Sequence, residues 1–239
     1  MDLDYLRQLN VFNPHDFKDR KVTIVGAGAT GSYIVFLLAQ IGIKNISIWD
    51  HDIVEEHNLP NQMFFIEHIG EPKVEALKDV IKRKCGFEIE THNEKVVDQN
   101  IAANYVFLLT DTMASRKEIY KNCIDAKRLF IDLVIETRMD ADNGRVYAFK
   151  PGRTAQSKEW LDTLYGDEES SESVCGATFS VAPTAAYLAS MAVWKLIQHF
   201  DVEYGPNHTE KKGKETELYN ESIFQLGPEE ILNRRFALV

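Results

Sequence analysis

The sequence predicts an α/β fold in which helices cover both faces of a mostly parallel β-sheet. Short apolar runs, typical of buried strands, alternate with stretches of helical periodicity, and a glycine-rich turn follows the first apolar run. Strands that alternate with helices build parallel sheets of this kind. The chain has 239 residues, 44% of them hydrophobic, which is enough to form a sizeable core. We expect one domain over residues 1–239, with residues 1–20 as an N-terminal extension.

The expected elements follow one another with little space between them. Apolar runs predict strands at 21–25, 45–49, 105–110 and 129–134, an added edge strand at 145–149 and a late strand at 218–225. Helical spacing predicts helices at 32–41, 73–85 and 114–126. Pro72 precedes the second of these helices, where its missing N–H costs least.

Three further segments differ in composition from the rest. Residues 178–197 are apolar enough to resemble a membrane span, but Pro183 and Lys195 interrupt them, so we expect a buried helix. Residues 165–174 are acidic and serine-rich, which predicts a mobile crossover loop. Residues 202–217 are polar and predict another loop, followed by C-terminal strand structure.

Charge and cysteine content exclude several classes of protein. The formal net charge of −10 argues against nucleic acid or a membrane surface as partner. The three cysteines include no C-x-x-C pair, which excludes a disulfide framework and a cysteine-built structural zinc site. The first residues lack the basic and apolar regions of a secretory signal, so we expect a cytoplasmic protein.

The glycine turn predicts a nucleotide site in a Rossmann-like first half. Gly26, Gly28 and Gly31 form G-x-G-x-x-G between a predicted strand and a predicted helix. Such glycines permit a tight turn, let a phosphate approach the backbone and let helix and strand pack closely. Asp50 ends the next strand, where a carboxylate can accept hydrogen bonds from a ribose. The pattern by itself also suits an NAD-dependent oxidoreductase.

The residues that follow favour a different chemistry. D-x-D at Asp50–Asp52, N-L-x-x-Q at Asn58–Gln62 and G-x-P-K-x-E-A at Gly70–Ala76 come in this order. Thr110-Asp111 ends a predicted strand, Arg116 follows five residues after Asp111, and Cys175 stands eight residues before Pro183. The series resembles the ThiF/MoeB/HesA superfamily of ubiquitin-activating-enzyme-like adenylating proteins over about residues 5–200. An NAD enzyme has no use for Lys73, Asp111 or the N-L-x-x-Q segment.

The resemblance implies an activity. Such proteins use ATP and Mg²⁺ to convert a C-terminal carboxylate into an acyl-adenylate, with release of pyrophosphate. The carboxylate belongs to a ubiquitin-like protein, a sulfur-carrier protein or a peptide, and the enzyme is expected to be a homodimer. The sequence does not distinguish these carriers, nor does it separate them from a small-molecule or RNA-linked carboxylate, although the acidic charge disfavours RNA.

The resemblance also assigns roles to individual residues. It places Gly26, Gly28, Gly31 and Lys73 at the phosphates, Asp50 at the ribose, Asp111 on magnesium, Asn58, Asn61 and Gln62 beside the nucleotide, and Asp52 near the phosphate or metal. Each has a plainer interpretation. Lys73 suits a solvated first-turn lysine, although cations are disfavoured at helix starts. Asp111 suits a helix cap, and Arg116 suits an exposed helix residue.

One departure from the family pattern bears on activity. The family carries an arginine in N-L-x-R-Q that neutralises pyrophosphate, whereas this chain has Asn61, which brings no charge. Arg7, which resembles an N-terminal arginine that reaches the neighbouring subunit's site, is one candidate replacement, and Arg138 is another. The alternative is a catalytically weak or inactive nucleotide-binding partner subunit.

Cys175 is the candidate nucleophile. In the family a loop cysteine takes the activated carrier as a thioester or joins in sulfur transfer. Glu168, Glu169 and Glu172 would raise the pKa of its thiol, and a small residue at a helix entry is an equal alternative. Cys85 and Cys123 lie on predicted helices and are expected to be structural.

Overall fold

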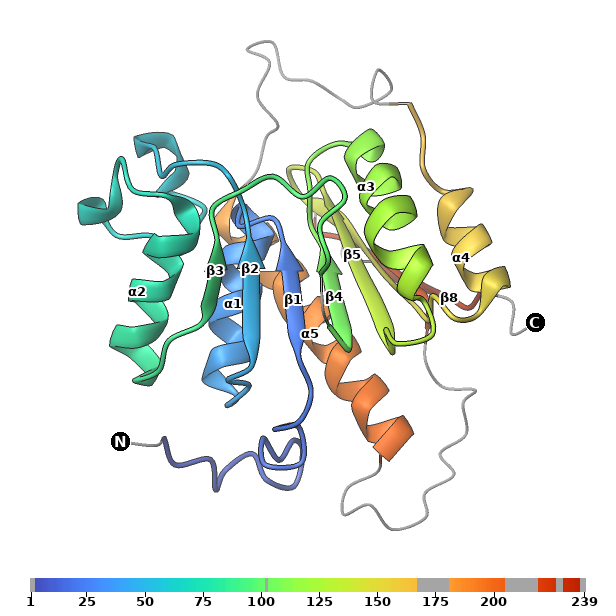
Figure 1. Ribbon diagram of the computed structural model, residues 1–239, viewed down its shortest axis with the longest axis horizontal. Coiled ribbons are helices and arrows are strands. Elements are labelled where there is room, and N and C mark those ends of the chain that lie inside the picture. The colour runs from blue at the N-terminus through green and yellow to red at the C-terminus, as the bar shows by residue number, and fades with distance from the viewer. Residues whose placement is uncertain (1–2, 102, 167–180, 205–218, 227–229, 237–239) are drawn as a thin grey trace.

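An eight-stranded sheet forms the centre of the computed structural model, which describes residues 3–101, 103–166, 181–204, 219–226 and 230–236 (Figure 1). The strands are β1 (Val22–Val25), β2 (Ile46–Trp49), β3 (Glu90–His92), β4 (Tyr105–Leu108), β5 (Leu133–Met139), β6 (Asn143–Phe149), β7 (Glu221–Gln225) and β8 (Glu230–Arg234). Their order is β3-β2-β1-β4-β5-β6-β7-β8. The first five strands in this order are parallel, and β6, β7 and β8 continue the sheet in antiparallel fashion.

Helices cover both faces of the sheet, as the sequence predicts. They are α1 (Ala29–Gln40), α2 (Lys73–Cys85), α3 (Met113–Ile119), α4 (Thr154–Leu161) and α5 (Ala182–Tyr204). On one face α1 packs against both α2 and α5, and α5 also crosses β5 and β6. On the other face α3 and α4 lie over the second half of the sheet (Figure 1). Among the described helices none is long and apolar enough to span a membrane.

The core divides into one apolar cluster for each face. The larger cluster joins α1, α2 and α5 to alternate strand residues such as Ile24 and Ile135. The smaller cluster joins Val106 and Val134 to α4 through Trp160, whose indole ring stacks on Phe149. Neighbouring strand residues thus serve opposite faces, which is why the buried strands are apolar throughout.

The N-terminal extension covers the amino ends of the strands. Phe17 packs its ring on Tyr105 and on Phe200 of α5, with ring centroids 5.2 and 5.0 Å apart. The side chain of Gln8 donates a hydrogen bond to the backbone oxygen of Ile41, just past the last residue of α1. Since α1 begins at the glycine turn, the extension lies at the opposite end of this helix from that turn.

The strand predicted at 129–134 is wrong in its bounds. Leu129 and Phe130 are 80% and 77% exposed in a turn, and β5 begins only at Leu133. The turn is fixed by the Phe130 N–H, which donates to the Lys127 oxygen, and by an ion pair between Asp132 and Arg20. An apolar dipeptide at the end of a helix was thus indistinguishable in the sequence from the start of a strand.

The prediction that residues 145–149 form an edge strand is also wrong. β6 begins at Asn143 and lies between β5 and β7, so both of its sides are paired. The strand at the edge is β8, which the sequence analysis did not find, because its five residues are all exposed and mostly polar. β3 and α4 were likewise not predicted.

Three helices differ from their predicted bounds. The helix expected at 32–41 is α1, which begins earlier, at Ala29, and ends at Gln40. The helix expected at 114–126 is α-helical only to Ile119; residues Tyr120–Ile124 form a π-helical turn and Asp125–Lys127 a 3₁₀ turn. α5 runs to Tyr204, so residues 202–204 of the expected 202–217 loop are helical, which corrects that expectation. The rest of this loop up to 217, and residues 167–174 of the expected crossover loop, lie outside the described residues.

The corrected start of β5 can be tested by a matched pair of substitutions. Leu133 is 3% exposed in the larger core cluster, so Leu133→Ala should lower the free energy of unfolding by about 2–4 kcal/mol. Leu129→Ala removes the same atoms from an exposed side chain and should change it by less than about 0.5 kcal/mol. Urea denaturation followed by circular dichroism measures both, and an equal loss in the two variants would contradict the corrected bounds.

Candidate nucleotide site

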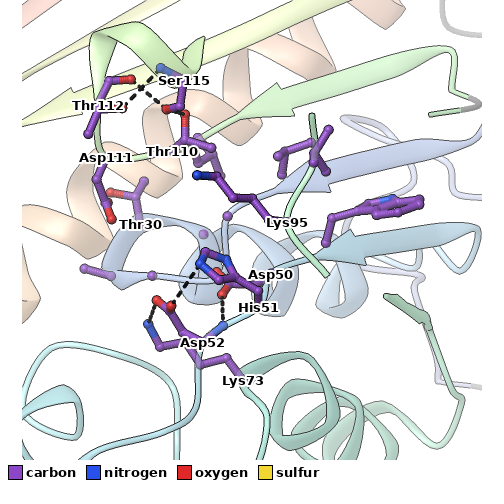
Figure 2. Close-up of a pocket in the computed structure, with 18 of the residues that line it drawn as sticks. Thr30, Asp50, His51, Asp52, Lys73, Lys95, Thr110, Asp111, Thr112 and Ser115 are labelled. Carbon is purple, nitrogen blue, oxygen red and sulfur yellow. Dashed lines mark hydrogen bonds and ion pairs between the residues drawn. The ribbon is translucent and has the colours of Figure 1, made fainter. Parts of the chain in front are cut away.

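A cavity of about 630 Å³ lies where β1, β2 and β4 end (Figure 2). Many of the residues singled out in the sequence line it. They are Gly26, Gly28, Gly31, Asp50, Asp52, Asn58, Asn61, Gln62, Lys73, Asp111 and Arg116. Figure 2 shows Thr110, Asp111 and Thr112 on the β4 side of the pocket and Asp50, Asp52 and Lys73 on the β2 side. The structure therefore gathers segments up to 90 residues apart in the chain around a single cavity.

The three glycines of the turn differ in the space around their Cα atoms. Gly26 has a φ of +106°, and a Cβ there would lie 2.6 Å from the Leu109 oxygen. A Cβ on Gly31 would lie 2.1 Å from the Gly26 oxygen, so helix and turn pack too closely for any side chain. A Cβ on Gly28 would meet no protein atom within 4 Å. Gly26 and Gly31 are thus required by the fold, whereas the space at Gly28 opens into the pocket.

The start of α1 points free backbone donors at this space. Gly28 is the N-cap residue of α1 and supplies no side-chain hydrogen bond to the first turn. The first N–H groups of a helix have no partner inside the helix, and they carry the positive end of the helix dipole. Such a helix start is a ready site for a phosphate group.

Asp50 ties β2 to the glycine turn. Its Oδ2 accepts a hydrogen bond of 2.6 Å from the Ala27 N–H, and its Oδ1 accepts one of 2.8 Å from the Asp52 N–H. Each carboxylate oxygen can accept a further bond. The residue placed at the ribose by the resemblance therefore also holds the glycine turn in position.

Lys73 is not a solvated lysine. Its side chain is 9% exposed, and its ammonium group pairs with the Asp52 carboxylate at 2.8 Å. The Lys73 N–H donates to the Asp52 oxygen, and Ile53 and Pro72 form a β-bridge beside it. Partial burial pushes the pKa of the Asp52 carboxyl upward, but the hydrogen bond and charge of Lys73 outweigh it and lower that pKa. The segment at Asp52 and the start of α2 at Lys73 are thus joined by a backbone hydrogen bond and by an ion pair.

Asp111 stands in the pocket with its carboxylate unused. Its side chain accepts no hydrogen bond from any residue that the structure describes. Desolvation raises the pKa of this carboxyl, while the positive charges of Lys73 and Arg116 act in the opposite direction. The alternative role as a helix cap is wrong, because Thr112 caps α3 by accepting a hydrogen bond from the Ser115 N–H at 3.1 Å. A desolvated carboxylate without a partner is the kind of ligand that Mg²⁺ binds.

Arg116 is buried, so its interpretation as an exposed helix residue is wrong. Its side chain is 7% exposed, its Nε pairs with Glu136 at 3.3 Å, and its guanidinium donates to the Thr137 oxygen. Because Arg116 also lines the pocket, it brings a fixed positive charge to the wall near Asp111.

The N-L-x-x-Q segment forms another wall of the pocket. The Asn58 side chain accepts a hydrogen bond from the Glu55 N–H, and the Ser32 hydroxyl accepts one from the Met63 N–H, which ties this loop to α1. Gln62 lines the pocket, and its Oε1 is buried without a hydrogen-bond partner among the described residues. Such an acceptor is costly to bury unsatisfied, which favours a ligand that donates to it.

Arg7, Arg138 and Cys175 are not part of this pocket. Arg7 is exposed in the N-terminal extension, next to Gln8, at the far end of α1 from the glycine turn. Arg138 does not line the cavity and is held by Glu136 and Thr163. Cys175 lies outside the described residues.

Lys95 is a pocket residue that the sequence analysis missed. It lines the cavity after β3, its side chain is exposed, and its ammonium group makes no ion pair with the described residues (Figure 2). Trp49 is also in the lining, with its indole stacked on His92 of β3 at 3.6 Å. Lys95 depends on β3, which has no apolar run, so no sequence signal pointed to it. Trp49 ends the predicted strand at 45–49, but its stacking also depends on β3. His51 and His57 also line the pocket.

The unused carboxylate predicts a trade-off between stability and binding at Asp111. A raised pKa means that the folded state holds the proton more tightly, so this group costs stability when the pH is above its pKa. Asp111→Asn should therefore raise the Tm at pH 7.5, and its advantage should shrink as the pH falls toward the ordinary carboxyl value of 3.8. Thermal unfolding scans across this pH range measure the difference in Tm between the variant and the parent.

The same variant should respond less to ligand. Mg²⁺ with ATP should raise the Tm of the parent protein more than that of Asp111→Asn, because the variant lacks the anionic ligand. A variant that is less stable than the parent at pH 7.5 without ligand would contradict the desolvation cost assigned to the Asp111 carboxylate.

Comparison with known proteins places this chain in a family. It is 32% identical over 138 residues to the molybdopterin-synthase adenylyltransferase of Escherichia coli, covering 52% of this chain and 55% of the relative. It is 30% identical over 149 residues to the NEDD8-activating enzyme E1 catalytic subunit of Arabidopsis thaliana, covering 56% of this chain and 33% of the relative. The chain thus spans only a third to about half of these relatives.

Solved structures confirm the fold. The crystal structure of E. coli MccB with ATP matches with a TM-score of 0.68 at 16% identity, covering 94% of this chain and 66% of that one. The structure of PaaA matches with a TM-score of 0.69 at 19% identity, covering 94% and 67%. The ThiF family model matches residues 5–230, nearly the whole chain, and the protein therefore belongs to the ThiF family.

Proposed function

We propose that this protein is an ATP-dependent adenylyltransferase that activates the C-terminal carboxylate of a ubiquitin-like protein, a sulfur-carrier protein or a peptide. The observation that carries the proposal is the single cavity in which the glycine turn, Asp50, Lys73 and Asp111 meet, in a chain of the ThiF family. The relative with a stated adenylyltransferase activity and the MccB structure with ATP support it.

The residues of the cavity fit ATP. Its volume of about 630 Å³ lies within the range of small-molecule sites. The open space at Gly28 and the uncapped start of α1 suit the phosphates, and Asp50 retains acceptor capacity for ribose hydroxyls. Gln62 Oε1 offers a further acceptor on the neighbouring wall.

The same residues suit the transfer of an adenylyl group. A carboxylate oxygen of the carrier attacks the α-phosphorus and forms a new P–O bond, while the bond from that phosphorus to the β-phosphate oxygen breaks and pyrophosphate leaves. Lys73 and Arg116 meet the negative charge on the phosphates. Asp111 would hold Mg²⁺, which neutralises phosphate oxygens. The remaining work is to place the carboxylate in line with the leaving group.

The pocket contains cations in place of the arginine that is absent at Asn61. Arg116 contributes a fixed guanidinium, and Lys95 contributes an ammonium group that is free of ion pairs with described residues. These charges favour an active adenylating enzyme over an inactive partner subunit. We also propose a cytoplasmic homodimer in which Arg7, exposed and distant from the pocket of its own chain, serves the site of the second subunit.

Pyrophosphate exchange tests the activity. Purified protein with ATP, Mg²⁺, labelled pyrophosphate and candidate carriers should incorporate label into ATP only when a suitable carboxylate is present. Lys73→Met should reduce the exchange rate roughly a hundredfold or more, because one cation at the phosphates is lost. Lys78→Met is the matched control, since Lys78 lies on the same helix but pairs with Glu75 and Glu88 outside the pocket, and it should exchange normally.

The outcomes separate the two functions. Exchange that requires a carrier and is lost in Lys73→Met supports adenylation. ATP binding by calorimetry without exchange, for every carrier tried, would instead support the inactive partner subunit.

We further propose that the Cys175 thiolate attacks the carbonyl carbon of the acyl-adenylate, so that a thioester with the carrier forms and AMP leaves. Cys85 and Cys123 are unsuited to this role because both are buried and desolvation raises the pKa of both thiols. Cys175→Ser should therefore keep pyrophosphate exchange but lose a reductant-sensitive adduct with the carrier on a denaturing gel. Cys85→Ser should keep both. An adduct that survives in Cys175→Ser, or a parent protein that exchanges without forming any adduct, would refute the transfer step.

A further inference from the structure

A buried carboxylate behind the pocket joins two arginines. Glu136 lies in β5 with none of its surface exposed. Its Oε1 pairs with Arg116 Nε at 3.3 Å, and both its oxygens accept from Arg138 Nε at 3.1 Å. The Trp160 indole N–H of α4 donates to Oε2, also at 3.1 Å. The carboxylate is thus fixed by three side chains from three different elements.

The two arginines differ in what else they contact. Arg116 lines the pocket and exerts its charge on Asp111. Arg138 does not line the pocket; it donates two hydrogen bonds of 2.8 Å to Thr163 and lies over the Tyr147 ring at 4.4 Å. Glu136 therefore lies between Arg116, which borders the pocket, and Arg138, which is hydrogen-bonded to other parts of the protein.

The charges of this cluster do not cancel. Two guanidinium groups share this one carboxylate, so Glu136 balances only one of them, and the Arg116 charge also acts on the Asp111 carboxylate on the pocket side. Buried charge is costly unless an anion compensates it. Among the described elements the open side of the cluster is the pocket wall at Arg116, so an anionic ligand in the pocket would meet this charge.

Glu136 supplies the only carboxylate paired with Arg116 among the described residues. The other contacts of the Arg116 guanidinium are the Thr137 oxygen and the Met113 sulfur, of which the sulfur is a weak acceptor. Arginine has many rotamers, and an ion pair to a buried, doubly anchored carboxylate removes most of them.

We propose that Glu136 is a positioning residue of the nucleotide pocket, which holds the Arg116 guanidinium against the pocket wall where the phosphates of ATP would lie. The inference rests on the proposed nucleotide site and goes beyond it, because Glu136 itself does not reach the pocket. Its consequence is that a residue hidden in the sheet sets affinity for phosphate charge, without altering affinity for the nucleoside.

Calorimetric titration of the full chain with Mg²⁺-ATP and with adenosine tests this. Glu136→Gln keeps the size of the side chain and an acceptor for Trp160 but removes the charge that fixes Arg116. We expect ATP to bind roughly tenfold more weakly and adenosine to bind within about twofold of the parent, since the proposal places the phosphates, and not the nucleoside, at Arg116. Equal ATP affinity in the parent and in Glu136→Gln would overturn the proposal, as would an equal loss for both ligands.

A double-mutant cycle shows whether Glu136 acts through Arg116. In an Arg116→Gln background, Glu136→Gln should cause no further loss of ATP affinity beyond about twofold, whereas independent effects would multiply. Independent effects would overturn the proposal. Trp160→Phe is the control, because it removes one hydrogen bond to the same carboxylate and leaves both ion pairs; it should bind ATP as the parent does.

Two precautions keep the result interpretable. Circular dichroism establishes that each variant is folded, and if Glu136→Gln is not, Glu136→Asp takes its place, because its carboxylate is withdrawn by one methylene group. The titrations measure ligand binding and do not depend on catalysis. A parent protein that binds ATP but never exchanges pyrophosphate would refute the proposed adenylation and leave this test in force.

Discussion

The pocket depends on the register of three parallel strands. Val25 of β1 pairs with Trp49 of β2 on one side and with Leu108 of β4 on the other. Since these residues end their strands at one level, the glycine turn, Asp50 and the Thr110-Asp111 segment leave the sheet side by side. Leu108 in turn pairs with Glu136 of β5, which brings the buried carboxylate to the same level. A slip of one residue in any pair would reverse the faces of its side chains and dismantle the site.

The distribution of charge explains how an acidic chain can hold an anionic ligand. The formal net charge is −10, yet Lys73, Lys95, Arg116 and the start of α1 converge on one cavity. Two of the acidic side chains near these cations already have partners. Asp50 is engaged by backbone N–H groups and Asp52 by Lys73, which leaves the desolvated Asp111 as the carboxylate most in need of a cation. Net charge therefore says little about the ligand, because interactions between exposed charges are screened over about 10 Å.

The elements predicted correctly from the sequence are those whose signals lie in neighbouring residues. The helix at 73–85 was predicted to the residue, because its amphipathic spacing and Pro72 are local signals, and in the structure Gly86 ends it in a left-handed conformation. β1, β2 and β4 were predicted to within two residues at either end, because strands buried on both faces are apolar throughout. β3 and β8 could not be found, because edge strands carry polar side chains and depend on pairing with distant partners.

The site shows the same division. Gly26, Gly28, Gly31, Lys73 and Asp111 belong to short motifs and were identified, and the structure gathers them in one cavity. The cap of α3 was misassigned because Asp111 and Thr112 are adjacent and both can cap, and only the hydrogen bond from Ser115 decides between them. The pair of Arg116 with Glu136 spans 20 residues and two elements, so nothing in either neighbourhood reveals it.

The two cations on opposite walls of the pocket are held in contrasting ways. The partner of Lys73 is Asp52, whose side chain is 47% exposed, so water can replace the lysine when it leaves. Such a half-exposed pair contributes about 1 kcal/mol or less, and a phosphate can exchange for it at small cost. The partner of Arg116 is Glu136, which is fully buried and is also held by Arg138 and Trp160, so it cannot move with the arginine. The structure thus combines one cation that can move with one that stays fixed, and in the proposed adenylation Lys73 would follow the phosphates as their charge shifts. A reaction in which negative charge moves from the α-phosphate to departing pyrophosphate needs both.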